Sequence, residues 1–158
     1  MILFSKSFKS NNDLVCFLTE KKAIKSFSVK HAFLDIDRNY FVRPEDRGCC
    51  YEDRPLAIGP EATISQPTTV AMMLEVLQVK AGESILDVGS GSGYTTALLA
   101  SLVGETGCVL GLEIQKALCA FSQKNLEAYS FSNIRIKQAS EGVLGEPGKQ
   151  FHKILVSA

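Results

Sequence analysis

The sequence has no excess of charge of either sign and no long run of one charge. Its 158 residues include 17 Lys and Arg and 17 Asp and Glu, so the formal net charge at pH 7 is zero. General nucleic-acid binders usually carry a basic excess, which this chain does not have. Hydrophobic residues make up 46 % of the chain, enough to build a core, so disorder is disfavoured as well. The length suits one domain rather than two.

Long apolar segments and metal-binding patterns are also lacking. The longest apolar runs are far shorter than the roughly 20 residues that a membrane helix needs. The start, MILFSKSFKS, has neither a long hydrophobic region nor a small-residue cleavage site, so we expect no signal peptide and no anchor. The five cysteines form no C-x-x-C pair, and two histidines give no recognisable zinc spacing. We therefore expect free thiols in a reducing cytoplasm and no metal.

The first 60 residues are polar and mixed in character. NNDLVCFLTEKK predicts a short helix capped by Asn12 or Asp13, and SVKHAFLDIDR predicts a second helix capped by Ser28. Residues 41–60 contain three prolines and two glycines, which predicts an ordered loop with little regular structure.

From about residue 63 onward, helix and strand patterns alternate. ISQPTTVAMMLEVLQVKAGE predicts a helix with Pro67 in its first turn and residues 81–83 at its end. SILDV, CVLGLE, NIRIKQ and FHKILVS predict strands, and YTTALLASLV and QKALCAFSQKNLEAY predict helices between them. This alternation is typical of βαβ units, so we expect an α/β fold with a mostly parallel sheet and helices on both faces.

The stretch ILDVGSGSGYTTALL, residues 85–99, carries the strongest functional pattern. A strand, a glycine turn and a helix direct backbone N–H groups into a crevice at the carboxyl edge of a sheet, where nucleotides and carboxylates bind. No G-K-[ST] follows, which excludes a P-loop. The spacing is G-x-G-x-G rather than G-x-G-x-x-G, which disfavours a nicotinamide-dependent dehydrogenase.

Two acids accompany this loop. Glu113 ends the next predicted strand, 20 residues beyond Gly93, where a carboxylate can accept hydrogen bonds from both hydroxyls of a ribose. The alternative is a surface glutamate at a strand end. Asp87 precedes the loop and either orients the glycine backbone or the ligand, or caps the loop.

These residues resemble the S-adenosylmethionine site of class I methyltransferases. YEDRPLAIGPEATISQP (51–67) with VAMMLEVL, together with DRNYFVRPED (37–46) and LVGETGCVLGLE (102–113), narrows the resemblance to protein-L-isoaspartate O-methyltransferases. The resemblance runs from about residue 12 to the end of the sequence. It implies a Rossmann-like fold and methylation of the free α-carboxylate of L-isoaspartyl and D-aspartyl residues in damaged proteins, which initiates repair.

The resemblance also implies the roles of particular residues. Ser65, the serine of the T-I-S motif, would be the catalytic hydroxyl that aligns the substrate carboxylate; its alternative role is a helix N-cap ahead of Pro67. A carboxylate and a sulfonium need alignment and exclusion of water rather than a strong base. The expected substrate-binding residues are Ile58, Gly59, Thr63, Ile64 and Ser65. The expected cofactor-binding residues are Asp87, Gly89, Ser90, Gly91, Gly93, Glu113, Ile114, Glu141 and Gly142.

The sequence departs from the family pattern in three places. Glu141 stands where the family commonly has an aspartate that contacts the adenine amino group, and Ala57 stands where many relatives have proline. The family sheet has seven strands, whereas this sequence predicts four, so we expect a Rossmann-like fold that lacks the last strands. Such a chain would be C-terminally truncated.

The expected organisation is one compact unit in two parts. Residues 1–62 would form a helical and loop region that contributes to the substrate site, and residues 63–158 the S-adenosylmethionine-binding part. The expected partners are isoaspartyl proteins and peptides, without nucleic acid or membrane, and the complete form would be a cytoplasmic monomer. Two alternatives remain open: a truncated relative that binds S-adenosylmethionine without activity, or a class I methyltransferase with another substrate, such as a small molecule or RNA.

Overall fold

The structure is a computed structural model, and it describes residues 8–143 and 145–157. Most of the starting segment MILFSKSFKS lies outside the described residues. The N-terminal elements are α1 (Asn11–Glu20), α2 (Phe27–Asp35), the 3-10 helices η1 (Arg38–Phe41) and η2 (Pro44–Cys49), and the strands β1 (Leu56–Gly59) and β2 (Ala62–Ile64). They are followed by α3 (Pro67–Leu77), β3 (Ser84–Val88), α4 (Tyr94–Val103), β4 (Cys108–Glu113), α5 (Lys116–Leu126), β5 (Ile134–Gln138) and β6 (Lys153–Val156).

The last four strands form one parallel sheet in the order β5-β4-β3-β6. Val88 at the end of β3 pairs with Leu112 of β4 and with Val156 of β6. The carboxyl ends of the two central strands therefore meet at one edge, where ligands bind in open α/β sheets. The expected α/β fold with a parallel sheet is confirmed.

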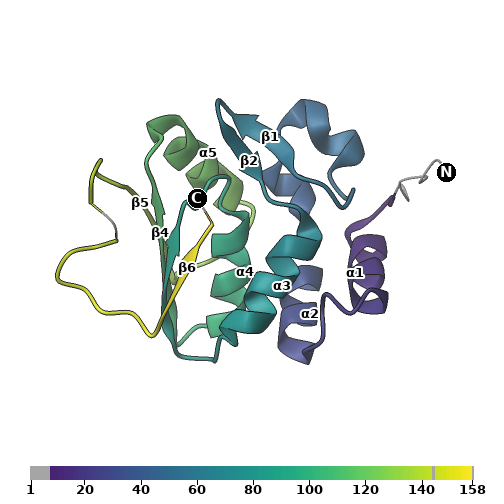
Figure 1. The fold of residues 1–158 in the computed structure, drawn as a ribbon, viewed down its shortest axis with the longest axis horizontal. Coiled ribbons are helices and arrows are strands. Elements are labelled where there is room, and N and C mark those ends of the chain that lie inside the picture. The colour runs from purple at the N-terminus through teal and green to yellow at the C-terminus, as the bar shows by residue number, and fades with distance from the viewer. Residues whose placement is uncertain (1–7, 144, 158) are drawn as a thin grey trace.

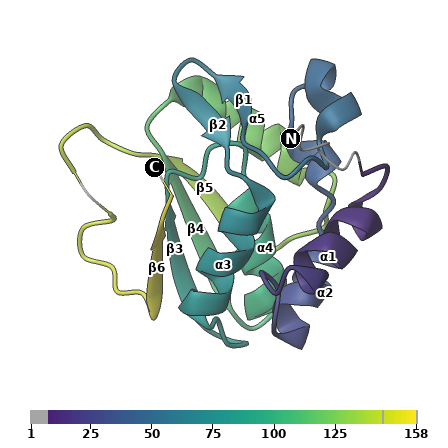
Figure 2. The same ribbon diagram turned by 45° about the vertical axis from the view of Figure 1, so that its right-hand side comes forward.

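The helices α1 to α4 lie on one side of this sheet, and residues 139–143 and 145–152 run along the other side (Figures 1 and 2). The main core draws side chains from both parts of the chain, including Leu14, Phe33, Leu98 and Val109. A smaller cluster of Leu86, Leu110 and Leu112 lies apart from it. The division at residue 62 stays a prediction, although one core cluster joins both sides of it.

Several predicted helix boundaries are wrong. Ser10 caps α1 by accepting the N–H of Asp13, and Ser26 caps α2 by accepting the N–H of Val29. The predicted caps fall inside the first turns of these helices, whereas an N-cap needs extended backbone just before the first turn. The helix α3 ends at Leu77, four residues before the predicted end at residues 81–83, because Gln78 is left-handed with φ 51°.

Residues 41–60 are more regular than the prediction of a loop. They contain η2 and the strand β1, which pairs antiparallel with β2. We call residues 56–64 the β1–β2 hairpin. It lies next to the carboxyl edge of the parallel sheet (Figure 2). The prolines and glycines of this segment favoured the prediction of a loop. In addition, both elements are too short to show a clear hydrophobic period.

Arg38 holds the segment that leads into this hairpin. Its side chain is fully buried, and Nε and Nη2 donate to the carbonyl oxygens of Cys50 at 2.9 Å and Arg54 at 3.3 Å. The guanidinium also lies 5.4 Å from the ring centroid of Tyr94, within cation–π range. Burial lowers the pKa of Arg38 to about 10, so the side chain is charged at neutral pH.

Candidate active site

The glycine turn between β3 and α4 has a backbone that few other residues could adopt. Gly89, Gly91 and Gly93 have φ values of 81°, 52° and 86°. The N–H groups of Gly89 and Ser90 donate to the carbonyl of Leu112 at 2.8 and 3.0 Å, which ties the turn to β4. A Cβ at Gly91 would lie 3.1 Å from Ile58 Cδ1, so the turn also packs closely against the β1–β2 hairpin.

Asp87 lies beneath the turn and is fully buried. Its Oδ2 accepts hydrogen bonds from the hydroxyls of Thr95 at 2.8 Å and Thr96 at 2.6 Å. Its Oδ1 is buried and has no hydrogen-bond partner in the described part of the chain. Burial raises the pKa of Asp87 to about 6. This carboxyl group therefore fixes the first turn of α4, which follows the glycines.

Glu113 lies at the end of β4 and is 6 % exposed, so the alternative of a surface glutamate is wrong. Its Oε2 accepts the N–H of Gly91 and its Oε1 accepts the N–H of Gln115, both at 2.9 Å. A carboxylate oxygen has two lone-pair sites, so each oxygen can accept one more hydrogen bond. The carboxylate is thus held in place with acceptor capacity left for the hydroxyls of a ligand.

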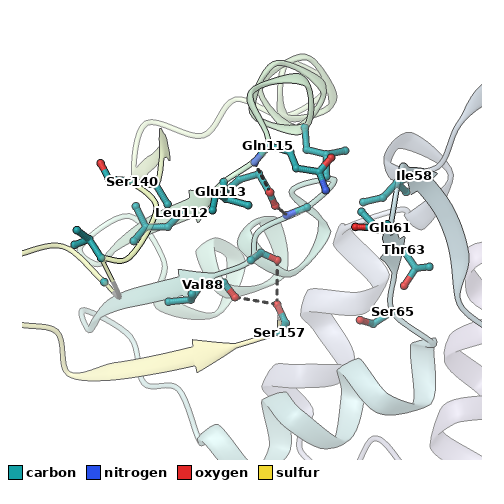
Figure 3. A pocket seen from close by; sticks show the side chains of 18 of the residues that line it. Ile58, Glu61, Thr63, Ser65, Val88, Leu112, Glu113, Gln115, Ser140 and Ser157 are labelled. Atoms are coloured by element: carbon teal, nitrogen blue, oxygen red, sulfur yellow. Dashed lines mark hydrogen bonds between the residues drawn. The ribbon is translucent and has the colours of Figure 1, made fainter.

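A cavity of about 650 Å³ lies beside this carboxylate. In Figure 3, Glu113, Gln115 and Leu112 come from the sheet side, Ser140 lies beyond them, and Ile58, Glu61, Thr63 and Ser65 form the opposite wall. The lining residues are Ile58, Glu61, Ala62, Thr63, Ser65, Val88, Gly89, Gly91, Leu112, Glu113, Ile114, Gln115, Leu118, Ala139, Ser140, Gly142, Val143, Gly145 and Ser157.

Ser65 lines this cavity and also a small adjoining pocket. The N-cap position of α3 belongs to Gln66, so the alternative of Ser65 as the cap is wrong. Asp53 satisfies the first turn instead, because its carboxylate accepts the N–H of Thr68 at 2.9 Å and its hydroxyl at 2.7 Å. The Ser65 hydroxyl is therefore not committed to starting the helix.

Most of the predicted site residues gather here. Eight line the main cavity: Ile58, Thr63, Ser65, Gly89, Gly91, Glu113, Ile114 and Gly142. Ile64 and Ser90 line the small pocket. Four lie outside both linings: Gly59, Asp87, Gly93 and the exposed Glu141. Asp87 and Gly93 support the turn from behind, whereas contacts of Gly59 and Glu141 with a ligand stay predictions.

Sequence reasoning missed several lining residues. Ser157 contributes a hydroxyl to both pockets and is within 3.4 Å of the Val88 carbonyl and 3.2 Å of the Gly89 carbonyl. The sequence signal for Ser157 was its position at the end of a predicted strand, which places it at the carboxyl edge of the sheet. Gln115 follows the predicted ribose acid by two residues, and that spacing was the available signal.

The site fits an adenosyl cofactor. Glu113 offers paired acceptors for vicinal hydroxyls, and the wall formed by Leu112, Ile114 and Val143 is apolar, as a purine ring requires. Asp87 Oδ1, which is buried without a partner, lies behind the glycine turn and outside both pocket linings. Among the described residues, no group of three His, Cys, Asp or Glu side chains could hold a metal ion.

A family model described as protein-L-isoaspartate(D-aspartate) O-methyltransferase matches residues 9–158. The chain belongs to this family. A protein-L-isoaspartate O-methyltransferase from Pyrobaculum arsenaticum is 40 % identical over 146 residues, which cover 92 % of this chain and 71 % of the relative. One from Aeropyrum pernix is 41 % identical over 136 residues, which cover 85 % of this chain and 52 % of the relative.

The fold matches the same family of methyltransferases. A crystal structure from Plasmodium falciparum, described as a protein-L-isoaspartate O-methyltransferase in complex with S-adenosyl-L-homocysteine, superposes with a TM-score of 0.84 at 28 % identity. The match covers 96 % of this chain and 74 % of that one. The predicted family and the Rossmann-like methyltransferase fold are therefore confirmed.

Proposed function

We propose that this member of the isoaspartate methyltransferase family transfers a methyl group from S-adenosylmethionine to the free α-carboxylate of L-isoaspartyl and D-aspartyl residues, which initiates repair of damaged proteins. The observation that carries the proposal is the shared cavity. The ribose acceptor Glu113, the glycine turn and the T-I-S serine Ser65 line one space of about 650 Å³. Relatives about 40 % identical carry the same activity in their names.

Distinct groups of residues would hold the cofactor. Glu113 would accept the ribose hydroxyls, Ile114 and Leu112 would contact the adenine, and the glycine turn would face the methionine part. The P. falciparum structure, which contains S-adenosyl-L-homocysteine, supports S-adenosylmethionine as the cofactor. When bound, S-adenosylmethionine supplies a methyl group already activated by its sulfonium sulfur.

The protein's part in the reaction is alignment. A carboxylate is an adequate nucleophile, so no general base is needed, and Ser65 can donate its hydroxyl proton as a hydrogen bond to one carboxylate oxygen. Ser65 comes directly after β2, which is tied to β1 through the pairs Leu56–Ile64 and Ala57–Thr63. The hairpin therefore positions the hydroxyl and, as one wall of the cavity, excludes water.

The experiment is methyl transfer from labelled S-adenosylmethionine to an L-isoaspartyl peptide and to its normal aspartyl twin. We expect label on the isoaspartyl peptide alone. Ser65→Ala should lower kcat by about 10- to 100-fold, because alignment is lost, while S-adenosylhomocysteine affinity changes little. The exposed Ser130 provides the matched control, and Ser130→Ala should act like the wild type. Equal labelling of both peptides, or full turnover by Ser65→Ala, would contradict the proposal.

The expected setting of the enzyme belongs to the same proposal. The partners would be isoaspartyl proteins and peptides rather than nucleic acid, and the enzyme would act as a monomer in the cytoplasm. Within the described residues, no helix has the length and apolar character to cross a bilayer. Zero net charge supports the absence of a nucleic-acid partner.

A further inference from the structure

Gln115 joins the two walls of the cavity. Its side-chain Nε2 donates to the carbonyl oxygen of Pro60, at the tip of the β1–β2 hairpin, over 3.1 Å. Its backbone N–H donates to Oε1 of Glu113 at 2.9 Å. One residue thus connects the ribose acceptor Glu113 with the tip of the hairpin that leads to Ser65. Gln115 and Pro60 are 55 positions apart in the sequence.

The rest of the hairpin is weakly constrained by its own pairing. It has strands of four and three residues, and the register shifts between Ala57 and Gly59. Two-stranded hairpins of this size are at best marginally stable alone. At the tip, Glu61 is left-handed with φ 54°, a conformation that costs energy for a residue with a side chain. External contacts must therefore hold the hairpin against the cavity.

The external contacts near the site differ in kind along the hairpin. Ile58 packs on Gly91, and Gly59 lies near Leu118, where an added Cβ would be 3.4 Å from Cδ2. These contacts are apolar and lack direction. The Gln115–Pro60 hydrogen bond is directional and acts at the tip, so it determines how closely the tip approaches the ribose side.

We propose that Gln115 is a positioning residue that fastens the hairpin tip to the carboxyl end of β4 and thereby slows release of the adenosyl cofactor. The proposal rests on the proposed function, because that function supplies the ligand. Gln115 acts through the hairpin, which carries Thr63 and Ile64 and leads to Ser65. Loosening the tip should therefore weaken retention of the cofactor and binding of the peptide, with little effect on the bond-forming step.

The test compares Gln115→Met and Gln115→Asn with the wild type. Methionine keeps the length without a donor, and asparagine keeps the amide but is too short to reach Pro60. We expect both variants to release S-adenosylhomocysteine about 3- to 10-fold faster in stopped-flow measurements, as loss of one exposed hydrogen bond implies. The KM for the isoaspartyl peptide should rise severalfold, kcat should stay within about twofold, and the Tm without ligand should be unchanged.

Gln123 is the matched control, because it is an exposed glutamine on α5, the helix that begins directly after Gln115. Gln123→Met should leave the release rate at the wild-type value. Unchanged release in both Gln115 variants, or a lower Tm without faster release, overturns the role of Gln115 while the wild type still binds the ligand. Failure of the wild type to bind S-adenosylhomocysteine overturns the role and the proposed cofactor together.

Discussion

Each half of the molecule has a charged side chain with no exposed surface, Arg38 in one and Asp87 in the other, and the two are used in opposite ways. In the N-terminal part, the cation of Arg38 spans irregular backbone and binds two carbonyl oxygens. In the sheet part, Asp87 sits at the end of β3 and accepts two hydroxyl groups from α4. Both side chains are fully buried, and neither has an oppositely charged group within ion-pair distance among the described residues.

The comparison shows where each half obtains its order. The sheet part has regular pairing through β3, β4, β5 and β6, so its shape does not depend on one polar side chain. The segment from residue 42 to residue 55 has only a short 3-10 helix, and Arg38 supplies bonds that a sheet would have supplied. Arg38 should therefore matter for folding, and Asp87 for the pH at which the site is stable.

The largest expected effect is that of Arg38→Met. The substitution leaves the buried carbonyl oxygens of Cys50 and Arg54 without their donors and removes a cation from the face of Tyr94. Loss of such a buried network should lower the free energy of unfolding by about 2–4 kcal/mol in urea denaturation. The destabilisation is not larger, because the substitution also removes the free-energy cost of burying the charged guanidinium.

Arg54→Met is the matched control in the same segment. The Arg54 side chain is half exposed and pairs with Glu52, and exposed pairs contribute about 1 kcal/mol or less. Its backbone carbonyl, which Arg38 binds, is unchanged. Equal destabilisation by the two substitutions would show that the buried cation has no special part in ordering this segment.

The second effect is a pH dependence that comes from Asp87. Its pKa rises from 3.8 to about 6 on folding, so between these values the folded state binds more protons than the unfolded state. Stability must then fall as the pH rises through this window, by about 3 kcal/mol for a shift of roughly two units. Asp87→Asn keeps an acceptor for Thr95 and Thr96 and removes the titration.

The measurement is urea denaturation of both proteins from pH 3.5 to pH 7. Subtracting one curve from the other cancels the other carboxylates, which titrate in both proteins. Relative to the variant, the wild type should lose stability as the pH rises from 3.8 to about 6 and then level off. A difference that is independent of pH would show that burial does not hold Asp87 in its protonated form.

The contrast between the halves also explains how far the sequence could predict the molecule. Strands such as SILDV and CVLGLE were correctly predicted because they are short, mostly apolar segments of parallel-sheet length. Arg38 and Asp53 were not singled out for their contacts, because these partners lie 12 to 16 positions away and leave no local period. The position of the cavity followed from the predicted strands, because the glycine turn comes directly after β3 and Glu113 is the last residue of the neighbouring strand β4.

The smallest effect should come from Glu113→Ala, which sharpens the comparison because it separates function from folding. Glu113 accepts two backbone N–H groups that a water molecule can take over at the cavity edge, so stability should change less than with Arg38→Met. Affinity for S-adenosylhomocysteine should weaken by about 1–3 kcal/mol in calorimetry, because ribose hydroxyls would lose their acceptors. Glu105→Ala, which removes an exposed glutamate in the turn before β4, is the control. An unchanged affinity in Glu113→Ala would remove the ribose assignment, and the ligand would then have to be held by the glycine turn and the apolar wall alone.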